Sequence, residues 1–169
     1  SYGSSGVGTS LHLAGEMVKQ QGGVAMTHVP YRGVAPLTND LLGGNIDFGV
    51  FVLSSALPYI RSGKMVALGT TEAKRSAITP DLPALGETPA LKSIDIGVWF
   101  ALMGPAKMPE PVVARLRKAL DETLQSPDFR RKMEATSSVV PLAPLDIERF
   151  LAAETAKYRN IVQFANIKE

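Results

Sequence analysis

Apolar residues recur every three or four positions in several stretches of the chain, the spacing that places them on one face of a helix. In the first stretch Leu11, Ala14 and Val18 share a face, and Gly22 and Gly23 follow. This pattern predicts a helix that ends at the two glycines. The same reasoning predicts six helices in all, at about residues 11–21, 34–42, 54–61, 109–124, 127–135 and 144–161.

Short runs dominated by apolar residues lie between these helices and predict strands. The run 46–53, IDFGVFVL, is nearly continuous, as expected for a strand that is covered on both faces. Further strands are predicted at 24–29, 65–71 and 94–103, and a proline-rich loop at 79–89. Because strands and helices alternate from Leu11 to Thr71, we expect an α/β fold with a parallel sheet and right-handed crossovers.

Ligands of such sheets bind beyond the carboxyl ends of the strands, where helix N-termini gather. The loops that follow Val29, Leu53 and Thr71 are therefore expected to share one edge of the sheet. The opening stretch, SYGSSGVGTS, leads into the first predicted helix and is expected to join them.

The opening stretch combines glycines with the hydroxyl groups of Ser4, Ser5, Thr9 and Ser10. Glycines allow close approach to the backbone, and the first N–H groups of a helix lack partners, so the stretch suits a small anion. A P-loop would need lysine where Thr9 stands, and a dinucleotide fingerprint would need glycine at Leu11, so both motifs fail. A flexible linker or a helix cap by Thr9 or Ser10 remains an equal alternative.

Composition narrows the class of protein. The 169 residues are 45% hydrophobic and 20% charged, which is typical of a globular fold, and the net charge of +2 argues against a nucleic-acid partner. The absence of cysteine excludes disulfides and thiol catalysis. With two distant histidines, the sequence predicts no metal site and no cofactor. The chain begins with serine and no signal segment precedes it, which leads us to expect a processed or excised piece.

Beyond about Pro105 the sequence predicts helices and at most a short strand near Val139 and Val140. No sheet is predicted there for the apolar helix faces to cover, although helices need a partner layer. Three arrangements remain open. These helices pack onto the first part of the chain, their sheet belongs to sequence outside this chain, or a second copy supplies the surface.

The chain carries six recognisable stretches: YGSSGVGTSLHLAGE, HVPYRGVAPLTNDLLGG, SALPYIRSGKMVALGTT, LPALGET, VWFALMGPAKMPEPVVARL and FANIKE. Together they resemble the tripartite tricarboxylate transporter substrate-binding proteins, also called Bug receptors. The resemblance implies a periplasmic solute-binding protein with a type II periplasmic-binding-protein-like fold, whose two α/β lobes close on a small carboxylate. It implies that residues 1–97 form the second lobe, a parallel-rich sheet flanked by helices. Residues 98–169 would form a crossing strand and the helical C-terminal part of the first lobe, the rest of which is absent.

The resemblance also implies positions for the ligand, in the opening loop and in the segment after the second predicted strand. The implied ligand-binding residues are Ser4, Ser5, Gly6, Gly8, Thr9, Tyr31, Gly33, Val34, Ala35 and Phe51. Relatives often carry a Phe-Asp-Asn-like run where this chain has Val50, Phe51 and Val52. This departure favours a more apolar acid, or a ligand that lacks an amino group.

Four other side chains have two interpretations each, and His28 has one. His12 is interpreted as a hydrogen-bonded structural residue that could instead reach an anion, and His28 as a structural residue. Asp47 is a hydrogen-bonding cap or a carboxylate in the cleft. Arg32 pairs with a ligand carboxylate or is exposed, and Trp99 belongs to the core or to the cleft wall.

The leading hypothesis is a binding protein without catalysis, which passes a dicarboxylate, amino acid or aromatic acid to membrane transporter subunits. The alternative is an enzyme that acts on a phosphorylated or acyl substrate, with the opening loop as an anion cradle and His12 or Asp47 as base. A third hypothesis concerns this chain by itself, which would bind nothing and would dimerise through exposed apolar helices.

Overall fold

The computed structural model describes residues 1–76, 79–136, 138–140 and 146–167. The chain separates into two compact units. The first, the sheet unit, comprises Ser1–Val98 and Ile147–Glu169, and the second, the helical unit, comprises Trp99–Asp146. Within the described ranges, no helix has the length and apolar character needed to cross a membrane.

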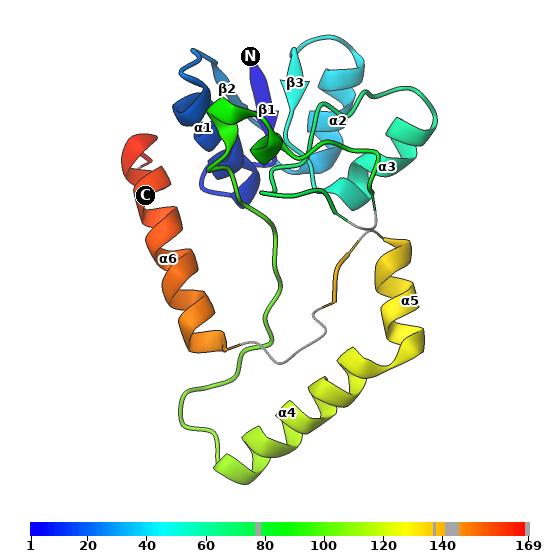
Figure 1. The fold of residues 1–169 in the computed structure, drawn as a ribbon, viewed down its shortest axis with the longest axis vertical. Coiled ribbons are helices and arrows are strands. Elements are labelled where there is room, and N and C mark those ends of the chain that lie inside the picture. Colours follow the sequence, from blue (N-terminus) through cyan, green and yellow to red (C-terminus); the bar gives the residue numbers. More distant parts are fainter. Residues whose placement is uncertain (77–78, 137, 141–145, 168–169) are drawn as a thin grey trace. The chain divides into compact units, whose positions relative to one another are not determined.

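The sheet unit contains a three-stranded parallel sheet with the order β2-β1-β3 (Figure 1). Its strands are short: β1 is Tyr2–Ser4, β2 is His28–Pro30 and β3 is Phe48–Gly49. Tyr2 pairs with His28 on one side and with Phe48 on the other. The predicted parallel sheet is confirmed, but its central strand lies within the opening stretch, where the sequence pattern predicts only a loop.

Four helices belong to the sheet unit: α1, Ser10–Gly22; α2, Val34–Leu42; α3, Leu53–Arg61; and α6, Ile147–Phe164. Two 3-10 turns, η1 at Leu85–Glu87 and η2 at Pro89–Leu91, lie within or next to the loop predicted at 79–89. The ends of α1 follow the predicted signals. The Thr9 hydroxyl accepts the N–H of His12, and Gly23, in the left-handed conformation, donates to the carbonyl of Lys19.

The core of the sheet unit forms where α1 packs against α6 and the segment that follows η2. Leu13, Ala14 and Met17 from α1 meet Ile94, Ile96 and Ile161 there. On the other side of α1, Tyr2 is fully buried and faces Gly15. Burial of this apolar face, more than helix propensity, therefore fixes α1 against the sheet.

Two predicted strands are wrong. In 65–71 only Thr70 makes a ladder contact, an isolated bridge to Ala84, and Val66 and Leu68 are exposed. The segment 94–103 has no strand either: the N–H of Ile96 donates to the carbonyl of Thr71 at 2.8 Å, but within the described residues this single bond does not extend into a ladder. Ile94 and Ile96 are buried all the same, so the apolar pattern there reflects packing on α1. Val139 and Val140 form no strand either.

The helical unit contains α4, Glu110–Gln125, and α5, Pro127–Ala135 (Figure 1). Ser126 separates them: its side chain accepts the N–H of Phe129, and Pro127 occupies the first position of α5. Both helices agree with the prediction. The apolar side chains of α4 that share a face remain exposed, as do most large side chains of the preceding segment. They are Val98, Trp99, Phe100, Leu102, Met103, Val112, Leu116 and Leu120.

Helix α6 was predicted to start at Pro144, which lies outside the described residues. The change of unit at Val98 falls next to the predicted lobe boundary at 97. Residues 147–169, however, group with the sheet unit, because α6 packs on α1. The assignment of 98–169 to another lobe stays a prediction.

Candidate functional site

The candidate site is the edge of the sheet at which the three parallel strands end. The last residues of β1, β2 and β3 are Ser4, Pro30 and Gly49, and each strand leads within a few residues to a helix start. Because the strands are parallel, the starts of α1, α2 and α3 gather at one edge (Figure 1). None of the three has an acidic residue in its first turn, and α2 and α3 have no side-chain cap. Their first N–H groups are thus available to an anion.

The opening loop, Ser5–Thr9, is folded tightly between β1 and α1. The Thr9 hydroxyl donates to the carbonyl of Gly6 at 2.8 Å and accepts the N–H of His12 at 3.3 Å. Gly6 and Gly8 have φ angles of 142° and 75°, which favour glycine at both positions. Within the described residues, the N–H groups of Ser5 and Val7 have no acceptor.

The loop after β2 lies against the opening loop. The N–H of Tyr31 donates to the carbonyl of Ser4 at 2.9 Å, and a Cβ on Gly6 would stand 3.6 Å from the Tyr31 carbonyl oxygen. Gly33, with φ of 106°, has open space on its side-chain side and precedes the uncapped start of α2. The Tyr31 hydroxyl donates to Asp40 at 2.8 Å, so its ring is anchored to α2.

The loop after β3 contributes an apolar side chain. The N–H of Val50 donates to the carbonyl of Gly3 at 2.9 Å, and the Phe51 ring folds over Gly49. A Cβ on Gly49 would stand 2.6 Å from Phe51 Cε2, so glycine allows the ring to lie there. Phe51 is half-buried, and α3 starts two residues later.

The predicted residues therefore divide into two groups. Ser5, Gly6, Gly8 and Thr9 share one loop, and the segment Tyr31–Ala35 lies beside it. Ser4 is different, because it is fully buried and its hydroxyl faces His28 at 2.7 Å. A direct ligand contact at Ser4 stays a prediction, and the geometry favours a role in holding the loop.

A buried polar cluster lies beneath the opening loop. The rings of His12 and His28 are stacked, with centroids 3.9 Å apart. His12 Nδ1 accepts the N–H of Gly8 at 3.1 Å, and His12 Nε2 is 3.8 Å from Glu16 Oε1. The structural interpretation of both histidines is confirmed. Sequence reasoning missed their contact with each other, and the sole signal was that they are the chain's two histidines, each within a predicted element.

Glu16 joins this cluster to the core. It accepts the Tyr2 hydroxyl at 2.7 Å and pairs with Lys19 at 2.8 Å. Burial raises the pKa of Glu16, but the hydrogen bonds from Lys19 and Tyr2 outweigh it and hold that pKa below its usual value. Burial, with the same carboxylate nearby, raises the pKa of Tyr2 well above its usual range.

The two histidines are neutral near pH 7. Burial lowers the pKa of His12, with Glu16 opposing the shift and Lys19 adding to it. Burial and the ring of His12 lower the pKa of His28 to about 4. The 3.8 Å contact of His12 with Glu16 is therefore that of an uncharged ring with a carboxylate that Lys19 already neutralises.

Three other candidates remain: Asp47, Arg32 and Trp99. Asp47 precedes β3, so it sits at the opposite edge of the sheet, where its exposed carboxylate accepts the hydroxyl of Ser1 at 2.8 Å. It cannot act as a base beside the opening loop. Arg32 is exposed, and Trp99, in the helical unit, is partly exposed.

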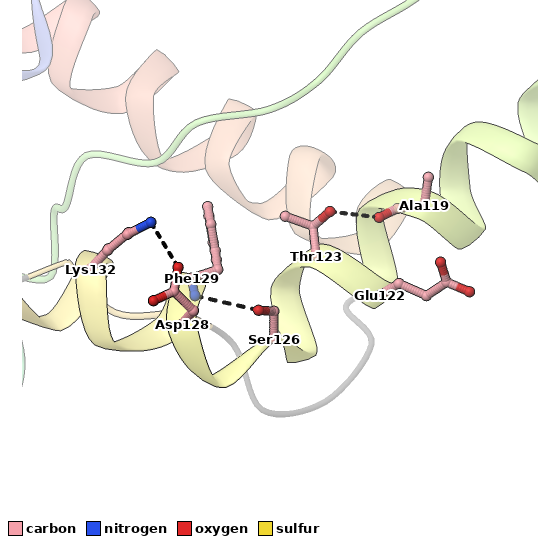
Figure 2. A pocket seen from close by; sticks show the side chains of 7 residues that line it. All are labelled: Ala119, Glu122, Thr123, Ser126, Asp128, Phe129 and Lys132. Carbon is pink, nitrogen blue, oxygen red and sulfur yellow. Dashed lines mark hydrogen bonds and ion pairs between the residues drawn. The ribbon is translucent and has the colours of Figure 1, made fainter.

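A hollow lies on the helical unit, at the bend between α4 and α5. Figure 2 shows the residues that line it: Ala119, Glu122 and Thr123 of α4, Ser126 at the bend, and Asp128, Phe129 and Lys132 of α5. Its cation is already paired, since Lys132 is 2.7 Å from Asp128. We favour the sheet edge as the ligand site because the N–H groups of Ser5 and Val7 have no acceptor there within the described residues, whereas Lys132 and Thr123 in this hollow already have partners.

Comparison with known proteins identifies the family. The family model described as "Tripartite tricarboxylate transporter family receptor" matches residues 1–167. The chain belongs to this family. The family's description is that of a transporter receptor, and two of the similar solved structures are described as binding proteins: the periplasmic binding protein BugD and a TctC solute binding protein from Polaromonas.

A UPF0065 protein of Bordetella pertussis is 32% identical over 164 residues, which cover 96% of this chain and 50% of the relative. The chain spans about half the length of most curated relatives it matches. Among solved structures, R. palustris Rpa4515 with adipate has a TM-score of 0.85 at 29% identity and covers 98% of this chain and 56% of its own. MatC from Rhodopseudomonas palustris with bound malate has a TM-score of 0.80 at 26% identity, covering 95% and 56%. The periplasmic binding protein BugD has a TM-score of 0.74 at 28% identity, covering 99% and 56%. The predicted periplasmic-binding-protein-like α/β fold is confirmed.

Proposed function

We propose that this receptor captures a small carboxylate at the carboxyl edge of its sheet and presents it to the membrane subunits of a tripartite tricarboxylate-type transporter. The observation that carries the proposal is the meeting of three helix starts, none with an acidic residue in its first turn. A carboxylate can accept hydrogen bonds from several such N–H groups at once, and the helix dipoles favour its charge.

The rest of the edge suggests which carboxylates fit. Phe51 lies half-buried beside the start of α3, and no buried cation stands in the opening loop. An anion that carries an apolar part matches N–H donors next to a ring. The similar structures solved with adipate and with bound malate concern four- to six-carbon dicarboxylates, which support this class.

The direct test is calorimetry on the complete protein with C4–C6 dicarboxylates, amino acids and aromatic acids. We expect at least one dicarboxylate to bind and to raise the unfolding temperature. Failure of the whole panel to bind or to stabilise would refute the proposal.

A charge placed at the edge gives a sharper test. Ala35 is exposed in the first turn of α2, so Ala35→Glu adds a carboxylate that the helix start itself favours. The variant should stay folded and should not bind dicarboxylates, because the added carboxylate occupies the N–H groups at the start of α2 and repels the negatively charged ligand. Gln20→Glu, an exposed change of equal charge near the far end of α1, is the matched control and should bind as wild type.

The helical unit enters the proposal through its exposed apolar side chains. We propose that 98–169 belong to the receptor's first lobe, whose sheet covers α4 in the complete protein. The exposure of Leu116 and Phe100, and a match to about half of the relatives' length, support this. Residues 1–169 by themselves should dimerise through these exposed surfaces. Light scattering should then give the mass of a dimer, and a monomer mass would contradict this prediction.

A periplasmic location follows from the same proposal, supported by the similar periplasmic binding protein BugD. No observation favours the enzymatic alternative. Its base would have to be His12 or Asp47, and His12 Nδ1 is occupied by Gly8 while Asp47 lies at the opposite edge.

A further inference from the structure

The opening loop is tied to the stacked histidine pair at both of its ends. Before the loop, the Ser4 hydroxyl is hydrogen-bonded to His28 Nε2 at 2.7 Å. Near its far end, the Gly8 N–H donates to His12 Nδ1 at 3.1 Å. The two ring centroids are 3.9 Å apart, so the rings form one stack. Ser4 and Gly8, the two anchors of the loop, are therefore both hydrogen-bonded to the same stack.

This arrangement requires a particular protonation of His12. A nitrogen that accepts an N–H must be unprotonated, so the ring proton of His12 lies on Nε2, on the side of Glu16 Oε1. The anchored Gly8 N–H points inward, and the N–H groups of Ser5 and Val7 are left without acceptors in the described residues. The anchoring therefore decides which loop N–H groups are free for a ligand.

We propose that His12 and His28 are positioning residues that hold the opening loop in its anion-accepting shape as a pair of uncharged rings, and that acid releases the loop. This inference rests on the proposed function only for its ligand readout. Protonation of His12 Nδ1 would place its N–H against the N–H of Gly8 and break that hydrogen bond. Protonation of either ring would also place a positive charge against the ring stacked on it.

The charges around the pair agree with this. The titratable groups that face the rings are Tyr2 from β1, and Glu16 and Lys19 from α1. Glu16 favours a protonated ring, but Lys19 pairs with this carboxylate and burial outweighs its effect on both histidines. Burial accordingly lowers the pKa of both rings, that of His28 to about 4.

The experiment compares two substitutions of His12 in the complete protein. His12→Asn keeps a side-chain oxygen near the position of Nδ1 but cannot be protonated, whereas His12→Phe keeps an aromatic ring on His28 and removes the acceptor. Ser4→Ala independently removes the other anchor. Glu72→Gln is the control for titration, because Glu72, remote from the loop in sequence, has its pKa raised by burial and by Asp95.

The first readout needs no ligand. Nuclear magnetic resonance follows the ring nitrogens of both histidines and the exchange protection of the Gly8 amide between pH 7.5 and pH 4. Wild type, His12→Asn and Glu72→Gln should protect Gly8 at pH 7.5, and His12→Phe should not. On acidification wild type and Glu72→Gln should lose protection as the rings titrate, while His12→Asn should keep it.

The second readout is calorimetry with adipate and malate at pH 7.5. His12→Phe and Ser4→Ala should weaken binding by about three- to tenfold, the worth of one hydrogen bond, and His12→Asn should stay within about twofold of wild type. Equal Gly8 protection in wild type and His12→Phe, no rescue by His12→Asn, or an unchanged acid profile in His12→Asn would overturn the inference. If wild type binds neither acid, the wider ligand panel decides the proposed function, and the Gly8 and ring signals alone decide this inference.

Discussion

The contact between Gly15 and Tyr2 allows a prediction whose size can be worked from the structure. An added Cβ on Gly15 would stand 2.6 Å from Cζ and 2.9 Å from Cδ2 of the Tyr2 ring. The ring is fully buried, its hydroxyl is bonded to Glu16, and it stacks on His28 and Phe48. Tyr2 therefore has no space into which it can retreat.

Two effects of Gly15→Ala oppose each other. Alanine stabilises a helix interior by about 1 kcal/mol relative to glycine. Overpacking a filled core costs about 1–3 kcal/mol, and a rigid ring places this site toward the upper end. We therefore expect a net loss of about 1–2 kcal/mol in the free energy of unfolding.

Urea unfolding of the complete protein, followed by circular dichroism, measures this loss as a lower midpoint at unchanged slope. The control is Gly22→Ala, where the nearest side-chain atoms would be 3.6 Å and 3.7 Å from the new Cβ, an ordinary contact. A Gly15→Ala protein as stable as wild type, or more stable, would show that α1 and β1 do not pack as closely as described.

Three further predictions concern the same unfolding free energy. Leu37→Ala, at a fully buried position, should cost about 2–5 kcal/mol, whereas Leu42→Ala, exposed on the same helix, should change it by less than about 0.5 kcal/mol. Wild-type stability should fall as pH drops from 6.5 toward 4, because unfolded His28 binds a proton there and folded His28, with its pKa of about 4, does not. The part of the slope that His28 contributes should stay below about 1.4 kcal/mol per pH unit. Denaturation of His28→Phe at pH 5 and 7.5 should give a flatter profile than wild type. Ser126→Ala removes the cap of α5 and should cost about 1 kcal/mol, read as earlier loss of helical signal, and an unchanged midpoint would contradict that role.

The helices were predictable because their signals are local. The spacing of Leu11, Ala14 and Val18, and the glycines at 22 and 23, lie within or next to α1 itself. The strands could not be predicted in the same way, because a strand forms only by pairing with a segment remote in the sequence. Tyr2–Ser4 carries no alternation that marks the central strand, while the apolar pattern of Ile94 and Ile96 reports burial against α1 and not a ladder.

The candidate site divides in the same way. Glycines and hydroxyls in 4–9 predict a loop that leads into a helix, and the structure has one. Whether Ser4 faces out or in depends on the register of β1 with β2, which sets Tyr2 beside His28 and brings the His28 ring to Ser4. Sequence periodicity carries no information on that register, so the histidine pair could not be predicted.

The charge balance under the opening loop explains how an anion site can lack a lysine. The buried layer holds the carboxylate of Glu16, the ammonium group of Lys19 and two uncharged histidine rings. Lys19 forms an ion pair with Glu16, so the two charges cancel. Its net charge is therefore zero, and the field at the edge comes from peptide N–H groups and from three helix starts. Their number is fixed by the parallel order β2-β1-β3 and not by any single side chain. Thr9 at the position of a P-loop lysine is thus no defect here, since it caps α1 and leaves the charge to the helices. A buried cation in its place would have to be desolvated whenever no anion was bound, which costs several kcal/mol by itself.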